Sequence, residues 1–410
     1  MKILYLCTHQ IHNLTPLLSE ISKNKKINFK VLYWQRILAD YHDPEFDKII
    51  NFGIDQFSGY KYYCLFNDEK VKYDLSFVFK LKILVKLFFF LLKEDYDVIV
   101  SHGYTYPNIF ALILSKIKGK KTIMRDISYN LGEKKIIFKY LRYIYYRLAN
   151  IFIDTFWTIH KLNENFFLDF GANKKKFYFI DHCQGEYETL IKNNPNLVLE
   201  KNDFIKKYNL PLNKKIIFFA GRFIERKNPI ILFEAFIKSK ISDDWILIMA
   251  GAGKQKYEIS EKIKQRNIKN TILLDFQSQQ SLINFFIFSE ILVLPSHLGD
   301  THGNIACEAA QFKCALLLSN MVGLHPECEK DKLGLVFKFN DKSNLISNIE
   351  EITSDNKKLS LYQNNIVINF QLLALTKSKP LAPIQLTLQA CNNEICLAPE
   401  TLSFNLPITH

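Results

Sequence analysis

Short, β-rich apolar runs alternate with longer stretches of helical pattern along most of this 410-residue chain. Such alternation is typical of parallel sheets in which a helix follows each strand. In the first half the predicted strands are residues 2–7, 29–34, 98–101, 121–125, 152–158 and 177–180. In the second half they are residues 215–220, 245–250, 271–275, 291–295, 315–319 and 334–337. The chain exceeds what one core usually supports, and its 48% hydrophobic residues suffice for two. The predicted fold class is therefore α/β, with two Rossmann-like domains.

A polar stretch at residues 186–213 interrupts this alternation, and we interpret it as a linker followed by a leading helix. The pattern stops again after residue 366. We expect a first domain at residues 1–190, a second domain at 191–366, and an atypical tail with two β-like runs at 367–410.

The charge balance favours an anionic partner. Lys and Arg number 54 against 41 Asp and Glu, a net charge of +13, with local clusters at residues 80–93 and 134–147. No zinc-finger, RRM or homeodomain signature accompanies the charge, which disfavours nucleic acid. Residues 80–93 interleave lysines with large apolar side chains. That pattern suits either the headgroup layer of a membrane or a packing helix with a solvated lysine face.

No apolar run reaches the length that spans a bilayer, and residues 1–7 lack the features of a signal peptide. We therefore expect a cytoplasmic protein, either free or peripheral at the inner face of the membrane.

Glycine is scarce, with 14 residues in the chain, so its positions are informative. Five glycines follow predicted strands of the second half: Gly221, Gly251, Gly253, Gly299 and Gly303. Ligands of parallel sheets bind beyond the carboxyl ends of the strands, and glycine there permits close approach of the backbone.

Two of the cations in the loop after residue 220 are candidate ligands. It contains Gly221, Arg222 and Lys227, and Pro229 is placed to start the next helix. A guanidinium and an ammonium beside a helix N-terminus suit a diphosphate, although a solvated basic loop has the same composition.

The segment at residues 294–310 carries two acids eight positions apart, Asp300 and Glu308. If a helix begins at Asn304, Glu308 lies one turn into it and Asp300 stays in the preceding loop. Gly303 would then leave the first helical amides open to a ligand. One carboxylate could hold ribose hydroxyls and the other could meet a transferred sugar.

In order and spacing, residues 221–229, 251–253, 293–296, 300–308 and 319–323 resemble the donor domain of retaining GT-B glycosyltransferases of family 4. The resemblance extends over most of residues 1–365 and is more specific in the second half. Asp300 stands where that family has the first glutamate of an E-x7-E motif. The resemblance implies two facing Rossmann-like domains and sugar transfer from a nucleotide-sugar donor to a glycan or lipid-linked acceptor, as in polysaccharide biosynthesis. It also implies no metal and no cofactor.

The resemblance assigns roles to single residues. Arg222 and Lys227 would bind the diphosphate, Glu308 the ribose, and Asp300 the donor sugar as a catalytic residue. Further donor contacts would come from the loop residues Gly221, Gly251, Thr301, His302, Gly303 and Asn304.

The first half offers fewer candidates. His102 resembles the active-site histidine that related enzymes carry at a strand end, where it bonds the donor sugar or orients the acceptor; a structural histidine is the alternative. His9 and Arg125 are acceptor-side candidates, although many relatives carry glycines near His9. Arg125 could equally form an ion pair with Asp126.

Other classes match less well. Asp95-Tyr96-Asp97 fits a manganese-binding DxD pattern, but it precedes a strand instead of following one. No G-x-G-x-x-G follows the first strand of either half, which disfavours a dehydrogenase. A sugar-nucleotide epimerase would share the phosphate contacts but matches the acid pair less closely. A truncated or inactive GT-B member that binds nucleotide sugar without turnover is the alternative to an active transferase.

The tail lacks the crossing helix with which relatives usually end. Residues 384–406 resemble the end of the periplasmic domain of thiol:disulfide interchange proteins, so we predict a foreign segment. Cys391 and Cys396 lie close enough in sequence for a hairpin disulfide, but a reducing cytoplasm would keep them as thiols.

Overall fold

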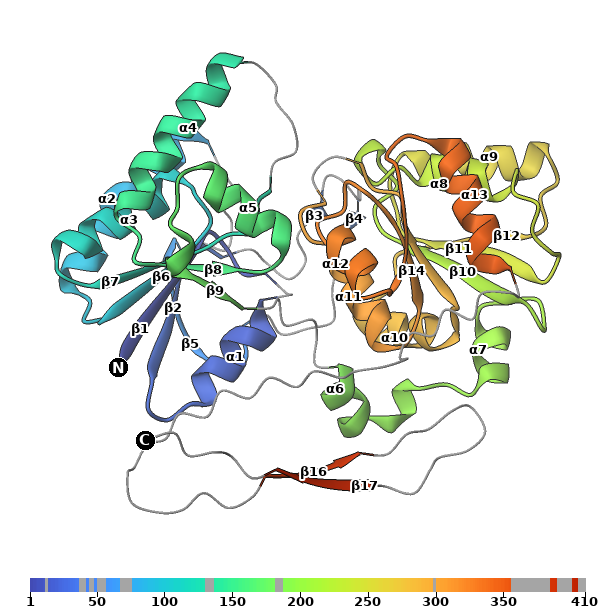
Figure 1. Ribbon diagram of the computed structural model, residues 1–410, viewed down its shortest axis with the longest axis horizontal. Helices are drawn as coiled ribbons and strands as arrows, with labels where there is room; N and C mark the ends of the chain where they lie inside the picture. The colour runs from blue at the N-terminus through green and yellow to red at the C-terminus, as the bar shows by residue number, and fades with distance from the viewer. Residues whose placement is uncertain are drawn as a thin grey trace. The chain divides into compact units, whose positions relative to one another are not determined.

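The structure is a computed structural model that describes residues 1–11, 14–36, 42–43, 48–49, 57–66, 76–129, 136–180, 187–297, 300–354, 384–388 and 400–404. Residues Met1–Leu361 form one compact unit and Tyr362–His410 a second. Figure 1 labels most of the helices and strands of both units.

The first domain is built on a seven-stranded parallel sheet in the order β5-β2-β1-β6-β7-β8-β9. Its strands are β1 (Lys2–Cys7), β2 (Asn28–Gln35), β5 (Lys61–Phe66), β6 (Val98–His102), β7 (Lys121–Arg125), β8 (Thr155–Thr158) and β9 (Phe177–Phe179). The six predicted strands are all present. The predictions did not include β5, an edge strand whose residues are exposed or half-buried although residues 62–66 form an apolar run. A two-residue pair, β3 (His42–Asp43) and β4 (Lys48–Ile49), stands outside this sheet.

Helices cover both faces of this sheet (Figure 1). Strand β1 shows the division, since Leu4 and Leu6 belong to one core and Tyr5 and Cys7 to the other. The first core packs against α2 (Phe77–Lys93), α3 (Tyr106–Ile117), α4 (Ile136–Ile151) and α5 (Lys161–Asp169). The second packs against α1 (Thr15–Lys23).

The second domain is a six-stranded parallel sheet in the order β12-β11-β10-β13-β14-β15. The strands are β10 (Lys215–Ala220), β11 (Trp245–Ala250), β12 (Thr271–Leu274), β13 (Ile291–Leu294), β14 (Ala315–Ser319) and β15 (Gly334–Phe337). All six agree with the prediction to within one residue at each end.

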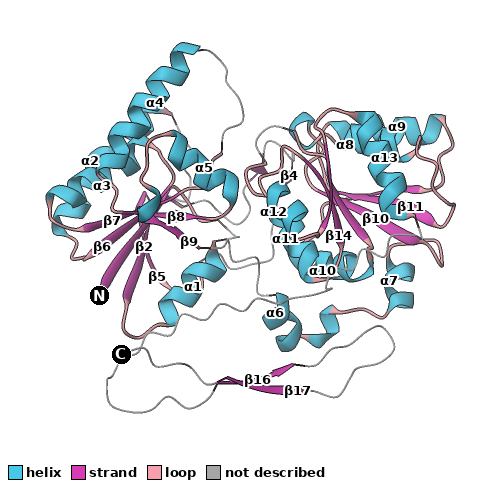
Figure 2. Ribbon diagram, in the orientation of Figure 1, coloured by secondary structure: helices cyan, strands magenta, loops and turns pink. Residues whose placement is uncertain are grey.

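The helices of the second domain also form two layers (Figure 2). One core includes α10 (Gln279–Phe288), α11 (Asn304–Gln311) and α12 (His325–Lys330). The other includes α8 (Pro229–Phe236), α9 (Gln255–Gln265) and α13 (Lys342–Thr353).

The polar stretch between the sheets is more helical than predicted. It contains α6 (Tyr187–Asn193), a 3₁₀ turn (Pro195–Leu197) and α7 (Lys201–Lys207). Tyr187 and Phe204 are its apolar anchors, because both are buried in the second domain's core. Further apolar side chains of the segment pack against the same core, so a stretch whose composition indicates a linker is ordered on the second domain.

Beyond residue 361 the described elements are β16 (Ile384–Leu388) and β17 (Glu400–Phe404), which pair antiparallel. Cys391 and Cys396 lie outside the described residues. Within the described part of the chain, none of the helices is long and apolar enough to cross a membrane.

Candidate active site

The loops that follow β10 and β11 leave the second sheet side by side. Ala220 stands opposite Ala250 in register, and the Gly221 amide donates to the Ala250 carbonyl at 3.0 Å. The Phe223 amide then donates to the Ala252 carbonyl at 2.7 Å. Gly251 has a φ of 148°, and a Cβ atom there would collide with the carbonyl oxygen of Gly221. Glycine is therefore required at Gly251 because the two loops touch there, whereas the sequence had suggested close approach of a ligand.

Lys227 and Asp300 meet at this edge of the sheet. Lys227 ends a 3₁₀ turn (Glu225–Lys227), and Asn228 in the left-handed region redirects the chain so that Pro229 begins α8. The Lys227 Nζ lies 2.7 Å from Asp300 Oδ2, and the Ser296 hydroxyl donates to the same oxygen at 2.7 Å. The first acid of the motif is thus bound to a cation of the loop that follows β10.

This pairing sets the charge of Asp300. Burial alone would raise its pKa, but the Lys227 ammonium and the hydrogen bonds from Lys227 and Ser296 outweigh burial. The pKa of Asp300 is therefore below its ordinary value, and the side chain is an anion at neutral pH.

Gly303 is the N-cap of helix α11, which begins at Asn304 as predicted. Its φ of 92° lies in the left-handed region, and a Cβ atom there would lie 2.6 Å from Val322 Cγ1. The loop before it is fixed by two backbone hydrogen bonds, from Gly323 to the Asp300 carbonyl at 3.0 Å and from Leu324 to the His302 carbonyl at 3.1 Å. The loop between the two acids therefore has a defined backbone.

Glu308 lies one turn into α11 and is buried. The Tyr187 hydroxyl donates to its Oε2 at 2.8 Å. Burial raises the pKa of Glu308 to about 7, and the Tyr187 hydrogen bond opposes part of that rise. The two acids thus differ in charge near neutral pH, because Asp300 has a cationic partner and Glu308 a neutral one.

His302, Thr301 and Asn304 complete the donor-side candidates. The ring of buried His302 stacks on His160, with centroids 5.7 Å apart, and its Nε2 lies 3.8 Å from the Cys307 sulfur. The His160 Nδ1 accepts from the Asn163 amide, so its Nε2 carries the proton and donates to the Thr301 carbonyl at 2.8 Å. Asn304 is the first residue of α11.

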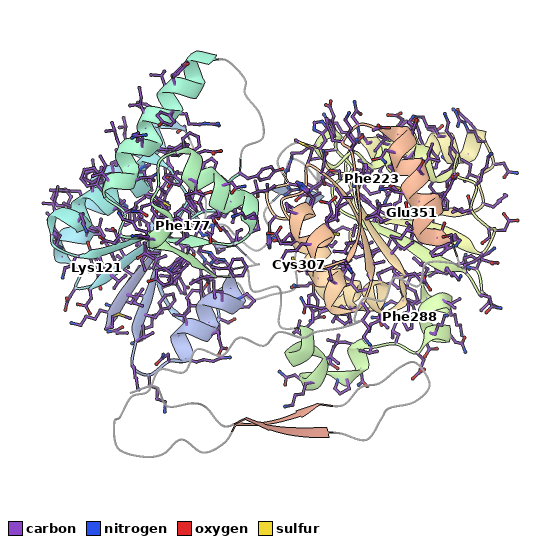
Figure 3. The ribbon with its side chains drawn as sticks, in the orientation of Figure 1. Lys121, Phe177, Phe223, Phe288, Cys307 and Glu351 are labelled. Carbon is purple, nitrogen blue, oxygen red and sulfur yellow. The ribbon has the colours of Figure 1, made fainter. Side chains whose placement is uncertain are left out.

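In Figure 3 the labelled Cys307 marks α11, and Phe223 marks the loop after β10 next to Arg222. Phe223 is fully buried in the core against α8 and α9. The burial of Phe223 therefore fixes the backbone next to Arg222.

The first-domain candidates lie at the carboxyl ends of neighbouring strands. His9, His102 and Arg125 follow or end the adjacent strands β1, β6 and β7, and His102 stands opposite Arg125 in register. His102 Nδ1 lies 3.1 Å from the Tyr5 hydroxyl. Burial lowers the pKa of His102 to about 3, assisted by the charges of Arg125 and His9, so its imidazole is neutral. Burial likewise lowers the pKa of His9 to about 4.

Asp95 and Asp97 lie at the opposite, amino-terminal end of the strands, because they precede β6. Asp97 accepts the Lys2 amide at 2.7 Å, and Asp95 pairs with the Lys2 ammonium. Among the described residues there is no group of three or more His, Cys, Asp or Glu that could hold a metal ion.

Three residues of this arrangement were not predicted from the sequence: Ser296, Tyr187 and His160. Ser296 had a weak signal, because it follows β13 four positions before Asp300. Tyr187 and His160 had none, since their contacts come from segments 121 and 141 positions away.

Comparisons with known proteins agree with the architecture. Residues 200–366 match the family Glycosyl transferases group 1. An Escherichia coli enzyme, UDP-Gal:alpha-D-GlcNAc-diphosphoundecaprenol alpha-1,3-galactosyltransferase, is 21% identical over 308 residues, which cover 71% of this chain and 75% of that protein.

Two solved structures share the fold. Sucrose-phosphate synthase from Thermosynechococcus elongatus has a TM-score of 0.61 and 16% identity, over 87% of this chain and 90% of its own. Anabaena Alr3699/HepE in complex with UDP and glucose has a TM-score of 0.59 and 14% identity, over 88% of this chain and 92% of its own.

Fold and matches together define a glycosyltransferase with the GT-B architecture, which confirms the predicted class. The match to Glycosyl transferases group 1 covers the second domain. The protein transfers a sugar from a nucleotide-sugar donor.

Proposed function

We propose that this protein is a retaining, metal-independent transferase of family 4 that moves a hexose from a uridine diphosphate sugar to a lipid-linked or surface glycan. The uridine nucleotide is supported by the E. coli relative, which uses UDP-Gal, and by the Anabaena structure, which contains UDP. The lipid-linked acceptor is supported by the same relative, whose name gives alpha-D-GlcNAc-diphosphoundecaprenol as its acceptor. A role in polysaccharide biosynthesis follows from such an acceptor.

The observation that carries the proposal is the cluster of Lys227, Ser296 and Asp300 beside the start of α11, with Glu308 one turn further on. In the free protein Lys227 neutralises Asp300 at 2.7 Å. A donor diphosphate would compete for that ammonium, and Arg222 would supply the second positive charge. Asp300 would then bind a hydroxyl of the donor sugar, and Glu308 the ribose hydroxyls.

The chemistry we propose is front-face displacement. The bond between the anomeric carbon and the diphosphate oxygen breaks, and the acceptor oxygen forms its bond on the same face. The departing phosphate oxygen takes the acceptor proton, so no side-chain nucleophile is needed. Arg222, Lys227 and the N-terminus of α11 would stabilise the charge that grows on the leaving group, which is the role a metal serves elsewhere.

His102 is proposed to act as a neutral hydrogen-bonding group. With its pKa lowered to about 3, the imidazole carries no charge at neutral pH and can orient a sugar or acceptor hydroxyl. His9 and Arg125 lie at the same edge and would meet the acceptor. A lipid-linked acceptor also places the enzyme at a membrane, and we propose peripheral contact at its cytoplasmic face.

A panel of nucleotide sugars tests the donor. We expect a thermal shift with UDP-hexoses and, with a polyprenyl-diphosphate-linked sugar, conversion to a product whose anomeric configuration matches the donor by NMR. An inverted product would refute the retaining mechanism. Binding without hydrolysis or transfer over a broad acceptor set would instead identify an inactive member of the fold.

A further inference from the structure

Helix α2 is apolar on two sides. One stripe, with Phe79, Ile83, Leu87 and Leu91, is buried in the first domain's core. A second stripe faces solvent at helical spacing; its members are between 44% and 62% exposed and comprise Val78, Leu81, Val85, Phe89 and Leu92. A helix that only packs on a sheet presents polar residues on its outer side. The outer stripe of α2 therefore has no explanation in the fold itself.

Helix α4 has a similar outer stripe. Leu141, Ile144, Leu148 and Ile151 recur every three or four residues and are 52% to 66% exposed. Helix α3 adds Ile117, which is 75% exposed. Because all three helices pack on the core of the same sheet face, their outer sides belong to one layer of the domain. Exposed apolar groups in such number mark an interaction surface.

The charges on these helices have one sign. The three helices contain eight Lys or Arg residues and no Asp or Glu. Lys82 and Lys93 of α2 are exposed between the apolar side chains. A second copy of this surface would meet it with like charge, which disfavours self-association. An anionic bilayer satisfies both features, since apolar side chains enter the boundary of the acyl chains and lysines meet the headgroups.

We propose that the outer side of α2, α3 and α4, here called the basic apolar face, docks on an anionic lipid bilayer with its helices parallel to the surface. Insertion across the bilayer is a different arrangement, and α2, with 17 residues and four lysines, is too short and too charged for it. The biological meaning of this docking rests on the proposed function, because a lipid-linked acceptor is confined to a membrane.

Vesicle flotation tests the proposal with the full chain. We expect the wild-type protein to float with vesicles that contain phosphatidylglycerol, to float far less with phosphatidylcholine alone, and to detach as salt rises. Lys82→Glu with Lys93→Glu should weaken binding to the anionic vesicles at least about tenfold, given about 1 kcal/mol for each basic residue near such a surface. Lys86 is left unchanged because its ammonium donates to the Leu65 carbonyl.

A second variant removes the apolar part of the face. Val85→Ser, Phe89→Ser and Leu92→Ser should also reduce binding about tenfold or more, while the melting temperature changes little because these side chains are exposed. A matched control for the charge variant lies in the second domain. Lys264→Glu with Lys269→Glu alters the net charge equally and should leave flotation unchanged.

Several results would overturn the proposal. These are absence of wild-type flotation, equal flotation of both variants and wild type, or a dimer in solution that the serine variant dissociates. Strong flotation only after deletion of residues 362–410 would show that the face is covered by this chain instead. Flotation is measured without donor or acceptor, and donor hydrolysis without vesicles, so failure of the docking and failure of the proposed function are separate outcomes.

Discussion

The ammonium of Lys227 and the carboxylate of buried Asp300 are 2.7 Å apart, and each is expected to contact a different part of the donor. If either side chain is removed, the other keeps its charge at a partly buried position without its ion-pair partner. We therefore expect Lys227→Ala to lower the free energy of unfolding by about 1–3 kcal/mol, because the Asp300 carboxylate would lose its cation and keep the hydrogen bond from Ser296. Urea titration should show partial recovery when Asp300→Asn is added, and no recovery would argue against a coupled pair.

Catalysis should depend on the cations and on the second acid. Glu308→Gln, and separately Arg222→Ala with Lys227→Ala, should lower turnover at least about a hundredfold, the scale of a lost charge contact in the transition state. The steady-state rate of UDP release with acceptor measures this. Lys264→Ala with Arg266→Ala, at the end of α9, is the control with the same loss of charge. Near-normal turnover of either active-site variant would remove these residues from the site.

Donor affinity should depend on pH through Glu308. Ribose hydroxyls donate to a carboxylate, so binding favours the ionised form, and burial raises the pKa of Glu308 to about 7. The dissociation constant for the UDP-sugar should therefore rise roughly tenfold as the pH falls from about 8 to about 6. Tyr187→Phe should shift this transition to higher pH, because the Tyr187 hydrogen bond lowers the pKa. Calorimetry at several pH values measures both effects, and Glu308→Gln should lack the dependence.

At the scale of elements, α11 depends on the backbone of Gly303. A side chain there would combine a φ of 92° with a contact of 2.6 Å to Val322. Gly119 also has a positive φ, of 72°, but a Cβ atom there would have no neighbour within 4 Å. Gly119→Ala should therefore cost only the backbone strain, about 1 kcal/mol, whereas Gly303→Ala should cost more and weaken donor binding. Equal urea midpoints for the two variants would show that the contact with Val322 relaxes freely.

Burial on both faces explains why most strands could be predicted from the sequence. Central strands such as β10 and β11 are buried on both faces and consist of continuous apolar runs. Helix α6 lacks that signal, whereas β5 has an apolar run at residues 62–66 and was still not predicted. For α6 the contacts include the bond from Tyr187 to Glu308 of α11 and the packing of its ring on Phe286 and Phe312, and no local pattern can report them.

At the scale of the molecule, strand direction decides at which end of its sheet each candidate site lies. The donor-side loops follow the carboxyl ends of β10, β11 and β13, while Asp95 and Asp97 precede β6 at the opposite edge of their sheet. Chelation with EDTA should therefore leave turnover unchanged, and Asp95→Ala should change it little, since its ion pair with Lys2 is solvent-exposed. A requirement for manganese would contradict the proposed metal-independent mechanism.

The sequence by itself determined the two parallel sheets, the loops that follow their strands and the helix that begins at Asn304. Each depends on local signals: apolar periodicity, glycine after a strand, and the spacing of two acids. Only the tertiary structure decided that Lys227 pairs with Asp300, that Tyr187 bonds Glu308, and that α2 and α4 present apolar stripes to solvent as well as to the core. These depend on which distant segments meet and on which side of a helix is covered. Burial also fixes the charge of Glu308 and His102, and burial is a property of the folded chain alone.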